Sequence, residues 1–555
     1  MNQYNLTAKQ NDYAVFLPAI SGFYATFVGK QRNELYVDPA RFPQGLTDME
    51  QMNWLNSQKA LFPYRWSLYS AGHANLDLNK QDWSEDMVRN REPGTFMLGD
   101  SGGFQIAKGL WEGEWRDPTS QAVQDKMAAL VAQGPTEVVN TKGKKIKKDP
   151  AADYQKRLDA AQKKRDAVLR WLDSIADYGM ILDIPTWVIH DKKSSKACGI
   201  ATLDEAVAAT KYNNLYFMAH RRGAKEGGAK FLNVLQGDGH DSAEEWYQQM
   251  KEFCDPAVYP ATHFDGWAMG GQNMCDVQLI LTRLVALRYD NLLQQGVHDW
   301  MHFLGTSKLE WAVLLTVIQR AVRKYVNPSF TISFDCASPF LATANGQVYY
   351  ENVFEHDSKW SYRMAPVLDD KKYSTDTRKW SVGLLADLPS TSNIKNWQDS
   401  PISDMLTMKD ICIYGPGDVN KNGKEGKTSW DSFSYALLMG HNVWMHLTAV
   451  QEANRRFDAG EHPAMMQRDG GDYEYFEDIV EEIFSAPDKA SAMAVIERSG
   501  YIGKTGYWNQ IVGTRGFKGK NTTNSHGRFN ALFEYEQTEQ EDFDSTKLDN
   551  LETTT

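Results

Sequence analysis

Two aspartates with the surroundings of catalytic acids stand at the ends of short apolar runs. Asp100 ends TFMLGD (95–100) and is followed by Ser-Gly-Gly-Phe, and Asp335 lies in FTISFDC (330–336). A carboxylate followed by two glycines lets a flat ligand approach the backbone closely, with Phe104 available to stack on it. One such aspartate alone is more often a helix cap or a surface acid. Two in one pocket can divide the cleavage of a glycosidic bond, one as nucleophile and the other as acid/base.

Apolar runs alternate with capped, helix-period segments, which is the pattern of βα units. Helix caps are predicted at Thr202, Ser242 and Ser307, each followed three residues later by Glu, and a further helix over 277–293. Eight strands are expected: AVFLPAI (14–20), RWSLYS (65–70), TFMLGD (95–100), MILDIP (180–185), FLNVLQG (231–237), GWAMGG (266–271), HFLGT (302–306) and FTISFDC (330–336).

Eight parallel strands with intervening helices predict an α/β fold, the (β/α)8 TIM barrel, with an open doubly wound sheet as the alternative. A barrel places its active site at the C-terminal ends of the strands. The residues at those ends are Asp100, Asp183, Gln236, Gly270, Gly305 and Asp335.

Two parts of the chain interrupt the repeat. We expect the first part of the barrel over 1–110, a helical basic insertion over 111–175, the remainder of the barrel over 176–460, and a C-terminal extension with an acidic tail over 461–555. A helix is expected to start near His441.

The bulk composition describes a folded protein of a reducing compartment. The chain has 555 residues, 42% of them hydrophobic, with five cysteines and a net charge of -12. Few cysteines favour a cytoplasmic location, which would be the host cytoplasm for a phage-encoded protein. Neither an export signal nor an apolar run of about 18 residues is found, so no membrane association is expected. The net charge disfavours a polyanionic partner, so local basic patches must decide that question.

Five motifs together resemble those of the tRNA-guanine transglycosylase superfamily over about 90–460: LGDSGGFQ, LNVLQGD, GWAMGG, HFLGT and SFDCAS. The resemblance implies that Asp335 is the nucleophile that forms a covalent glycosyl intermediate. It implies that Asp100 protonates the leaving guanine and deprotonates the incoming base, without a cofactor for the chemistry. The resemblance also implies that Asp183 binds the N1 and 2-amino edge of the purine. Other polar atoms of the base would be held by Ser101, Gln236, Gly270 and Gly271, and its ring would lie between Phe104 and Leu304.

The chemistry of guanine agrees with these roles. The leaving base needs a proton, while the acid on the opposite face of the sugar must stay ionised to attack C1′. A carboxylate at Asp183 accepts from N1–H and the 2-amino group together, which adenine cannot offer. Asp276, after the glycine pair, either orients that backbone or caps the next helix.

A structural zinc is implied by the same resemblance, but its ligands are incomplete here. The matching stretch offers Cys412 and His441, with Asp410 as a carboxylate replacement for a third ligand. A closed zinc site usually has four nitrogen or sulfur donors. A buried Cys412 and a core His441 without metal are therefore the preferred interpretation.

Basic residues interleaved with aromatics predict nucleic-acid contacts, and a solvated charge run is the alternative, above all for the lysines at 142–148. As a whole the chain resembles the DNA-modifying branch of the superfamily, the DpdA-type enzymes of phages and bacterial islands, which exchange guanine in DNA for a 7-deazaguanine such as preQ0. The same exchange on tRNA and a non-catalytic nucleic-acid-binding subunit are the alternatives. The candidate contacts are Lys144, Lys145, Lys147, Lys148, Lys504, Arg515 and Lys518.

Overall fold

The chain forms an eight-stranded parallel barrel, as the sequence predicted. The computed structural model describes residues 12–32, 37–139, 145–223, 226–274, 276–356, 359–419, 423–467 and 475–500. The sheet order is β1-β10-β9-β8-β7-β6-β3-β2, and an isolated parallel bridge between Ala19 and Leu68 joins its two ends. The strands are β1 (Val15–Pro18), β2 (Trp66–Ser70), β3 (Phe96–Asp100), β6 (Tyr178–Met180), β7 (Lys230–Leu235), β8 (Gly266–Met269), β9 (Trp300–Phe303) and β10 (Thr331–Cys336).

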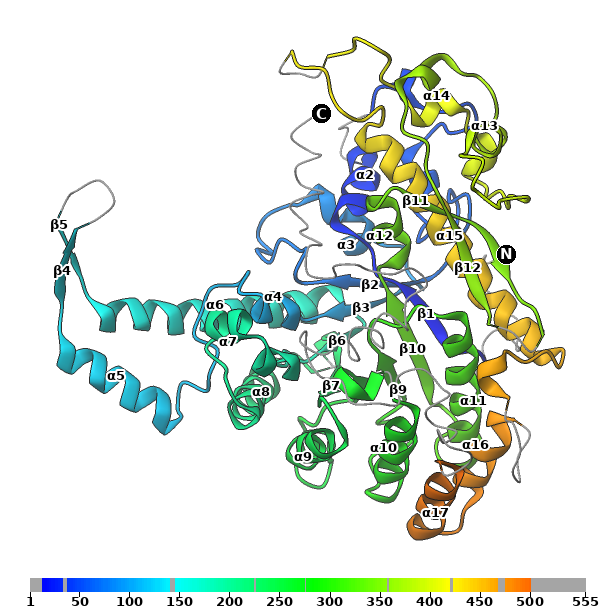
Figure 1. Cartoon of the computed structure of the whole chain (residues 1–555). Coiled ribbons are helices and arrows are strands. Elements are labelled where there is room, and N and C mark those ends of the chain that lie inside the picture. The colour runs from blue at the N-terminus through cyan, green and yellow to red at the C-terminus, as the bar shows by residue number, and fades with distance from the viewer. Residues whose placement is uncertain are drawn as a thin grey trace.

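Helices surround the barrel (Figure 1). They are α2 (Gly22–Arg32), α3 (Asp86–Arg89), α6 (Pro150–Ile175), α8 (Leu203–His220), α9 (His240–Met250), α10 (Val277–Tyr289), α11 (Leu309–Tyr325) and α15 (Ser432–Asp458). Two short helices, α4 (Gly103–Ala107) and α7 (Lys192–Cys198), lie in loops that follow β3 and β6. Among the helices of the described ranges, none is both long enough and apolar enough to cross a membrane.

Aromatic rings fill the lower part of the barrel. Trp300 of β9 stacks on Phe96 of β3 at 4.6 Å between ring centroids, and lies 5.3 Å from Tyr178 of β6 and 6.0 Å from Trp66 of β2. Because β9 is not a neighbour of these three strands in the sheet, the rings meet across the barrel interior. This layer closes the barrel below the mouth.

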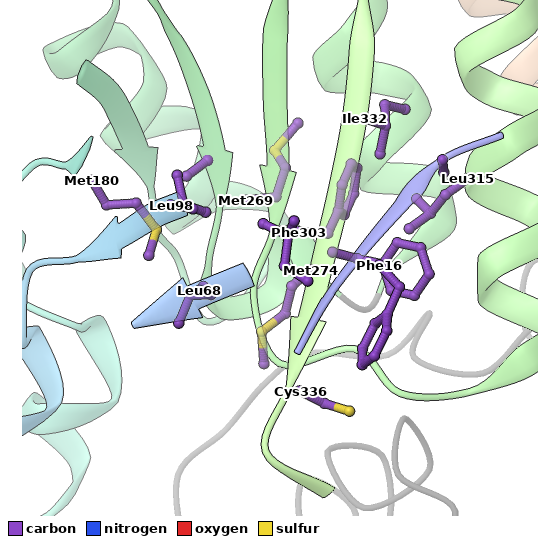
Figure 2. Packing of buried hydrophobic residues seen from close by; sticks show 14 of the residues in the cluster. Phe16, Leu68, Leu98, Met180, Met269, Met274, Phe303, Leu315, Ile332 and Cys336 are labelled. Carbon is purple, nitrogen blue, oxygen red and sulfur yellow. The ribbon is translucent and has the colours of Figure 1, made fainter. Parts of the chain in front are cut away.

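The alternation of side chains along each strand determines which residues lie above the layer of aromatic rings. Side chains two residues apart on a strand point to the same side. Leu68, Leu98 and His302 therefore face the interior above the rings, and Figure 2 shows Leu68 and Leu98 in the hydrophobic packing. One further step along β2 and β3 brings Ser70 and Asp100 to the mouth. The polar site thus rests on a packed apolar floor.

The opposite faces of the strands pack against the helices. Phe16 of β1 stacks on His446 of α15 with ring centroids 4.4 Å apart, and Cys336 Sγ lies 3.8 Å from the same imidazole. Phe16, Phe303, Ile332 and Leu315 appear together in this outer layer in Figure 2.

The insertion is an arm that projects from the barrel (Figure 1). It consists of α5 (Gln121–Gln133), an antiparallel hairpin of β4 (Thr136–Val139) and β5 (Lys145–Lys148), and the start of α6. The sequence predicted a helical insertion, and the structure adds a two-stranded hairpin between its helices. The end of α6 belongs to the barrel layer, because it contacts β3 and β6 and buries Leu169, Trp171 and Leu172.

The region after β10 contains further elements. These are α12 (Ser338–Ala344), the hairpin β11 (Gln347–Val353) and β12 (Ser361–Pro366), α13 (Trp380–Asp387), α14 (Met408–Ile411), α16 (Phe476–Ser485) and α17 (Lys489–Gly500). Helix α15 lies between α11 and α2 and so completes the barrel layer. It begins at Ser432 with Asp431 as its cap, so the expected helix start near His441 was wrong.

Several other predicted boundaries were also wrong. Helix α9 begins after Gly239, so Ser242 lies in its first turn, and α11 begins after Lys308 instead of being capped by Ser307. Strand β6 ends at Met180, since the Asp183 N–H turns back to the Ile181 carbonyl and Pro185 has no N–H to donate. The predicted cap at Thr202 was correct.

Candidate functional site

Asp100 lies at the barrel mouth, at the end of β3, where the neighbouring strand β2 supplies its main partner. The Ser70 hydroxyl donates to Asp100 Oδ2 at 2.6 Å, and the Gly102 N–H approaches Oδ1 at 3.4 Å. Burial raises the pKa of Asp100 above its ordinary value, although these two donors oppose the rise. The negative charge of Asp335 raises this pKa further. Asp100 is therefore suited to holding a proton.

Asp335 has a different environment. Its Oδ1 accepts from the Gly305 N–H at 2.9 Å and lies 3.1 Å from His302 Nε2. Within the described part of the chain, no hydrogen bond reaches the other oxygen, Oδ2. The side chain is 14% exposed, so Oδ2 is the oxygen left to meet a ligand.

His302 is fully buried and belongs to a chain of hydrogen bonds below Asp335. Trp300 Nε1 donates to Ser333 Oγ at 2.8 Å, and Ser333 Oγ lies 2.9 Å from His302 Nδ1. A neutral imidazole whose Nε2–H faces the carboxylate has Nδ1 as an acceptor, which the Ser333 hydroxyl satisfies. This arrangement fixes the imidazole with its N–H directed at the acid.

Asp183 and Gln236 form a polar pair beside Asp100. Gln236 Nε2 donates to Asp183 Oδ2 at 2.7 Å. Burial raises the pKa of Asp183 to about 7, the Gln236 hydrogen bond lowers it, and the charge of Asp100 raises it. The buried Gln236 Oε1 has no hydrogen-bond partner among the described residues. An acceptor so placed suits a ligand with N–H groups.

Two glycines allow the segments around this pair to approach closely. A Cβ at Gly103 would lie 2.9 Å from the Asp183 carbonyl oxygen, so the loop after β3 contacts the loop after β6. Gly271 has a φ of 54° and lies against Gly237, where a Cβ would come within 2.3 Å of the carbonyl oxygen. Gly270 adjoins Gln236, and its N–H donates to the Leu235 carbonyl. The glycine pair therefore adjoins Gln236, and contact of its backbone with a purine stays a prediction.

Other predicted purine contacts have partners within the protein. The Ser101 hydroxyl donates to the Ile181 carbonyl at 2.9 Å, so its hydrogen links β3 to β6 and only its lone pairs remain for a ligand. Phe104 is 41% exposed and tilts against Trp187 at 6.2 Å between centroids. Leu304 is half-buried at the end of β9. Stacking of a purine between Phe104 and Leu304 stays a prediction.

Asp276 caps α10, which was the second of the two roles considered for it. Its Oδ1 accepts from the Leu279 N–H at 3.0 Å, and its Oδ2 lies 2.9 Å from His240 Nε2. The side chain is fully buried.

The predicted basic contacts are only partly described. Lys147 and Lys148 are exposed on β5, and Lys145 begins that strand. Lys144, Lys504, Arg515 and Lys518 lie outside the described residues.

The three candidate zinc ligands are each engaged elsewhere. His441 Nδ1 lies 2.8 Å from Ser400 Oγ and its Nε2 lies 2.7 Å from the Tyr349 carbonyl, so both nitrogens have partners. Cys412 Sγ donates to the Leu368 carbonyl, and Asp410 accepts from Thr407 at the start of α14. No group of three or more His, Cys, Asp or Glu side chains in the described ranges is arranged around a metal position. These residues do not fit a four-ligand zinc site.

Sequence reasoning missed three residues of the site. Ser70, His302 and Ser333 contact the two acids or their partners, yet none was assigned a role. The signal was available in the alternation of the strands: Ser333 precedes Asp335 by two residues, and His302 precedes Leu304 by two. Ser70 is the last residue of β2, just as Asp100 is the last residue of β3.

Fold and site together define a (β/α)8-barrel protein with three acids, Asp100, Asp183 and Asp335, at the C-terminal mouth. No protein-family model matches the chain. No curated protein matches it either.

Proposed function

We propose that this chain is a pentosyltransferase that exchanges guanine in DNA for a 7-deazaguanine base such as preQ0. The observation that carries the proposal is the pairing of Asp100 and Asp335 in one barrel mouth, where the charge of one raises the pKa of the other. Two acids with distinct environments can serve as acid/base and nucleophile.

In the first step Asp335 Oδ2 attacks C1′ of the target nucleotide. The bond from C1′ to the base nitrogen breaks as the bond from C1′ to the carboxylate oxygen forms. Asp100 gives its proton to the departing guanine. The donors Gly305 N–H and His302 Nε2 hold Oδ1, which orients the carboxylate and stabilises its negative charge before attack.

In the second step the incoming base loses a proton to Asp100 and attacks C1′. The ester bond to Asp335 breaks and its carboxylate returns. Two displacements retain the configuration at C1′, and both acids end in their starting protonation states.

The polar pair Asp183 and Gln236 supports a guanine-like base. Guanine and its 7-deaza analogues present N1–H and a 2-amino group as adjacent donors. Asp183 and the unpartnered Gln236 Oε1 are acceptors that match such an edge. Adenine has no N–H at N1, so it would leave one of these acceptors unpaired.

DNA is favoured as the acceptor by the resemblance to the DNA-modifying branch and by the projecting arm with exposed Lys147 and Lys148. A base in a duplex must leave the stack before an enzyme can reach its C1′. The arm provides positive charge outside the barrel for the backbone of such a substrate.

The test is incorporation of labelled guanine into duplex DNA, single-stranded DNA and tRNA by the full chain. Incorporation into DNA, with a covalent adduct that is trapped in the wild type and absent in Asp335→Ala, is the expected result. Incorporation into tRNA alone would show that the substrate is tRNA and would refute DNA as the acceptor. Turnover retained by Asp335→Ala would refute the assignment of the nucleophile.

A further inference from the structure

An aromatic and cationic surface lies at the rim of the site. Phe104 of α4 and Trp187 of the 3-10 helix η4 (Thr186–His190) are adjacent, with their planes 48° apart. The Lys108 ammonium lies 5.6 Å from the centre of the Phe104 ring and 5.1 Å from that of Trp187. We call Phe104, Lys108 and Trp187 the rim platform.

The rim platform adjoins the pocket because both of its elements begin there. Helix α4 begins three residues after Asp100, and η4 begins three residues after Asp183. The two loops touch where Gly103 meets the Asp183 carbonyl oxygen. A nucleotide next to one seated at Asp183 would therefore reach the platform first.

A second cation and aromatic ring lie on the other side of the Asp100 turn. Lys164 of α6 lies 4.9 Å from the centre of the Trp111 ring. A Cβ at Gly102 would come within 2.4 Å of that indole, so Trp111 packs against the turn after Asp100. Two lysines over aromatic rings thus flank one catalytic loop.

Negative charge in the barrel mouth disfavours a polyanionic ligand, so cations at the rim would help such a ligand to bind. Three carboxyl groups, from Asp100, Asp183 and Asp335, lie in the mouth; the charge of Asp335 raises the pKa of Asp100, and that of Asp100 raises the pKa of Asp183. In the proposed reaction Asp335 is ionised, and its negative charge repels a phosphate. Lys108 and Lys164 are the cations that lie beside aromatic rings at the same mouth.

We propose that the rim platform binds the nucleotide that flanks the target guanosine in a DNA strand. Its base stacks on Trp187, and the phosphate that joins it to the target contacts Lys108. This inference rests on the proposed function for the identity of the target. In the proposed function Phe104 stacks on the target purine, which leaves the adjacent Trp187 for a neighbouring base. An aromatic ring beside an ammonium is the combination that single-stranded nucleic acids bind without sequence readout.

The test measures binding of a single-stranded oligodeoxynucleotide with one guanine and 2-aminopurine beside it, without an incoming base. We expect 2-aminopurine fluorescence to be quenched by the wild type and not by Trp187→Ala. Binding by Trp187→Ala should be roughly 5- to 150-fold weaker, the range for loss of one stacked base. Trp187→Phe should retain most of the affinity. Leu215→Ala, which removes a 48% exposed leucine of α8, is the surface control.

Two further measurements do not depend on how Trp187→Ala folds. An abasic site in place of the flanking nucleotide should weaken binding to the wild type by a similar factor. Lys108→Gln should reduce the slope of log Kd against log salt by about 0.7, the value for one phosphate of a single strand. Lys395→Gln, at an exposed lysine between α13 and α14, should leave that slope unchanged.

The outcomes separate this inference from the proposed function. If guanine exchange proceeds but neither an abasic flank nor Trp187→Ala changes binding, the platform is refuted and the activity stands. If flank-dependent quenching is found but no nucleic acid incorporates guanine, the proposed function fails and the platform stands. If the wild type binds neither DNA nor tRNA, both are overturned.

Discussion

Replacing Asp183 with asparagine tests whether the pocket holds an acid that destabilises the fold. Asp183 is 6% exposed, and burial raises its pKa from an ordinary 3.8 to about 7. At 1.36 kcal/mol for each pH unit, the difference corresponds to about 4 kcal/mol. Asparagine carries no charge, and its oxygen can still accept from Gln236.

The direction of the stability change follows from the protonation of Asp183 in the folded and in the unfolded chain. Below about pH 3, Asp183 is protonated in the folded chain and largely so in the unfolded chain, so the variant should differ little from the wild type. As pH rises towards 7 the unfolded chain releases this proton while the folded chain keeps it, so folding stability falls. Above about pH 7 the loss is complete. Asp183→Asn should then be up to about 4 kcal/mol more stable than the wild type.

The assay is the thermal unfolding midpoint of both proteins at about pH 4.5, 6 and 8. For 555 residues the unfolding entropy is about 1.2 kcal/mol/K, so 4 kcal/mol corresponds to a rise of about 3 °C at pH 8. Asp290→Asn is a control variant whose stability should change in the opposite direction. Burial alone would raise the pKa of Asp290, but hydrogen bonds from Lys251 and Tyr247 hold it below its ordinary value, so this variant should lose stability at pH 8.

A ligand measurement completes this test. Guanine should raise the midpoint of the wild type at pH 8 and raise that of Asp183→Asn much less, because the amide replaces one carboxylate oxygen with an NH2 group that cannot accept from guanine. The reasoning is refuted if Asp183→Asn is less stable than the wild type at pH 8, or if their difference does not change with pH.

Three further predictions concern groups around the acids and the arm. His302→Phe removes the N–H that orients the carboxylate of Asp335, the proposed nucleophile, so single-turnover exchange should slow by roughly 100-fold through misplacement of the attacking oxygen, with little change in KM. Ser70→Ala removes a donor that lowers the pKa of Asp100, so the pKa should rise and the alkaline limb of the pH–rate profile should move to higher pH. Charge reversal of Lys147 and Lys148 should weaken duplex DNA binding and reduce its salt slope by about 0.9 for each lost phosphate contact, measured by titration at several salt concentrations.

Each of these predictions has a matched control. His302→Gln retains an N–H donor and should recover part of the rate; equal loss in both variants would argue for a packing effect. Ser67→Ala is the control for Ser70→Ala. It removes another hydroxyl of β2, which donates to the Phe96 carbonyl, and it should leave the pH–rate profile unchanged. Charge reversal of Lys395 should not change DNA affinity, and an equal effect there would contradict a role for the arm.

The fold was predictable because barrel strands repeat one local signal. Each strand is a short apolar run followed by a helix, and this pattern needs no knowledge of distant contacts. The hairpin at the tip of the arm was not predictable in this way, since β5 is the run Lys-Ile-Lys-Lys, which lacks an apolar pattern. Its pairing with β4 depends on the chain reversing direction between them. Helix α15 was misplaced because its apolar stripe extends well before His441.

The site was predictable where residues stand at strand ends and unpredictable where contacts join separate strands or distant segments of the chain. Asp100, Asp183, Gln236 and Asp335 follow from position and motif. The bond from His302 to Asp335 joins two neighbouring strands, and its partner is fixed by strand register, which one sequence does not reveal. The engagement of both nitrogens of His441 depends on Ser400 and Tyr349, which are distant in the chain.

In the proposed reaction, the coupling between Asp100 and Asp335 would link proton transfer to the covalent step. The charge of Asp335 raises the pKa of Asp100, so the acid keeps its proton before reaction. When Asp335 becomes an ester that charge disappears, and Asp100 becomes a stronger acid as the departing guanine needs a proton. When the ester breaks, the charge returns and Asp100 becomes a stronger base as the incoming base must lose one. Asp335→Asn should therefore lower the pKa of Asp100, which infrared difference spectra against an Asp335→Asn/Asp100→Asn protein can measure. An unchanged pKa would mean that the two acids act independently.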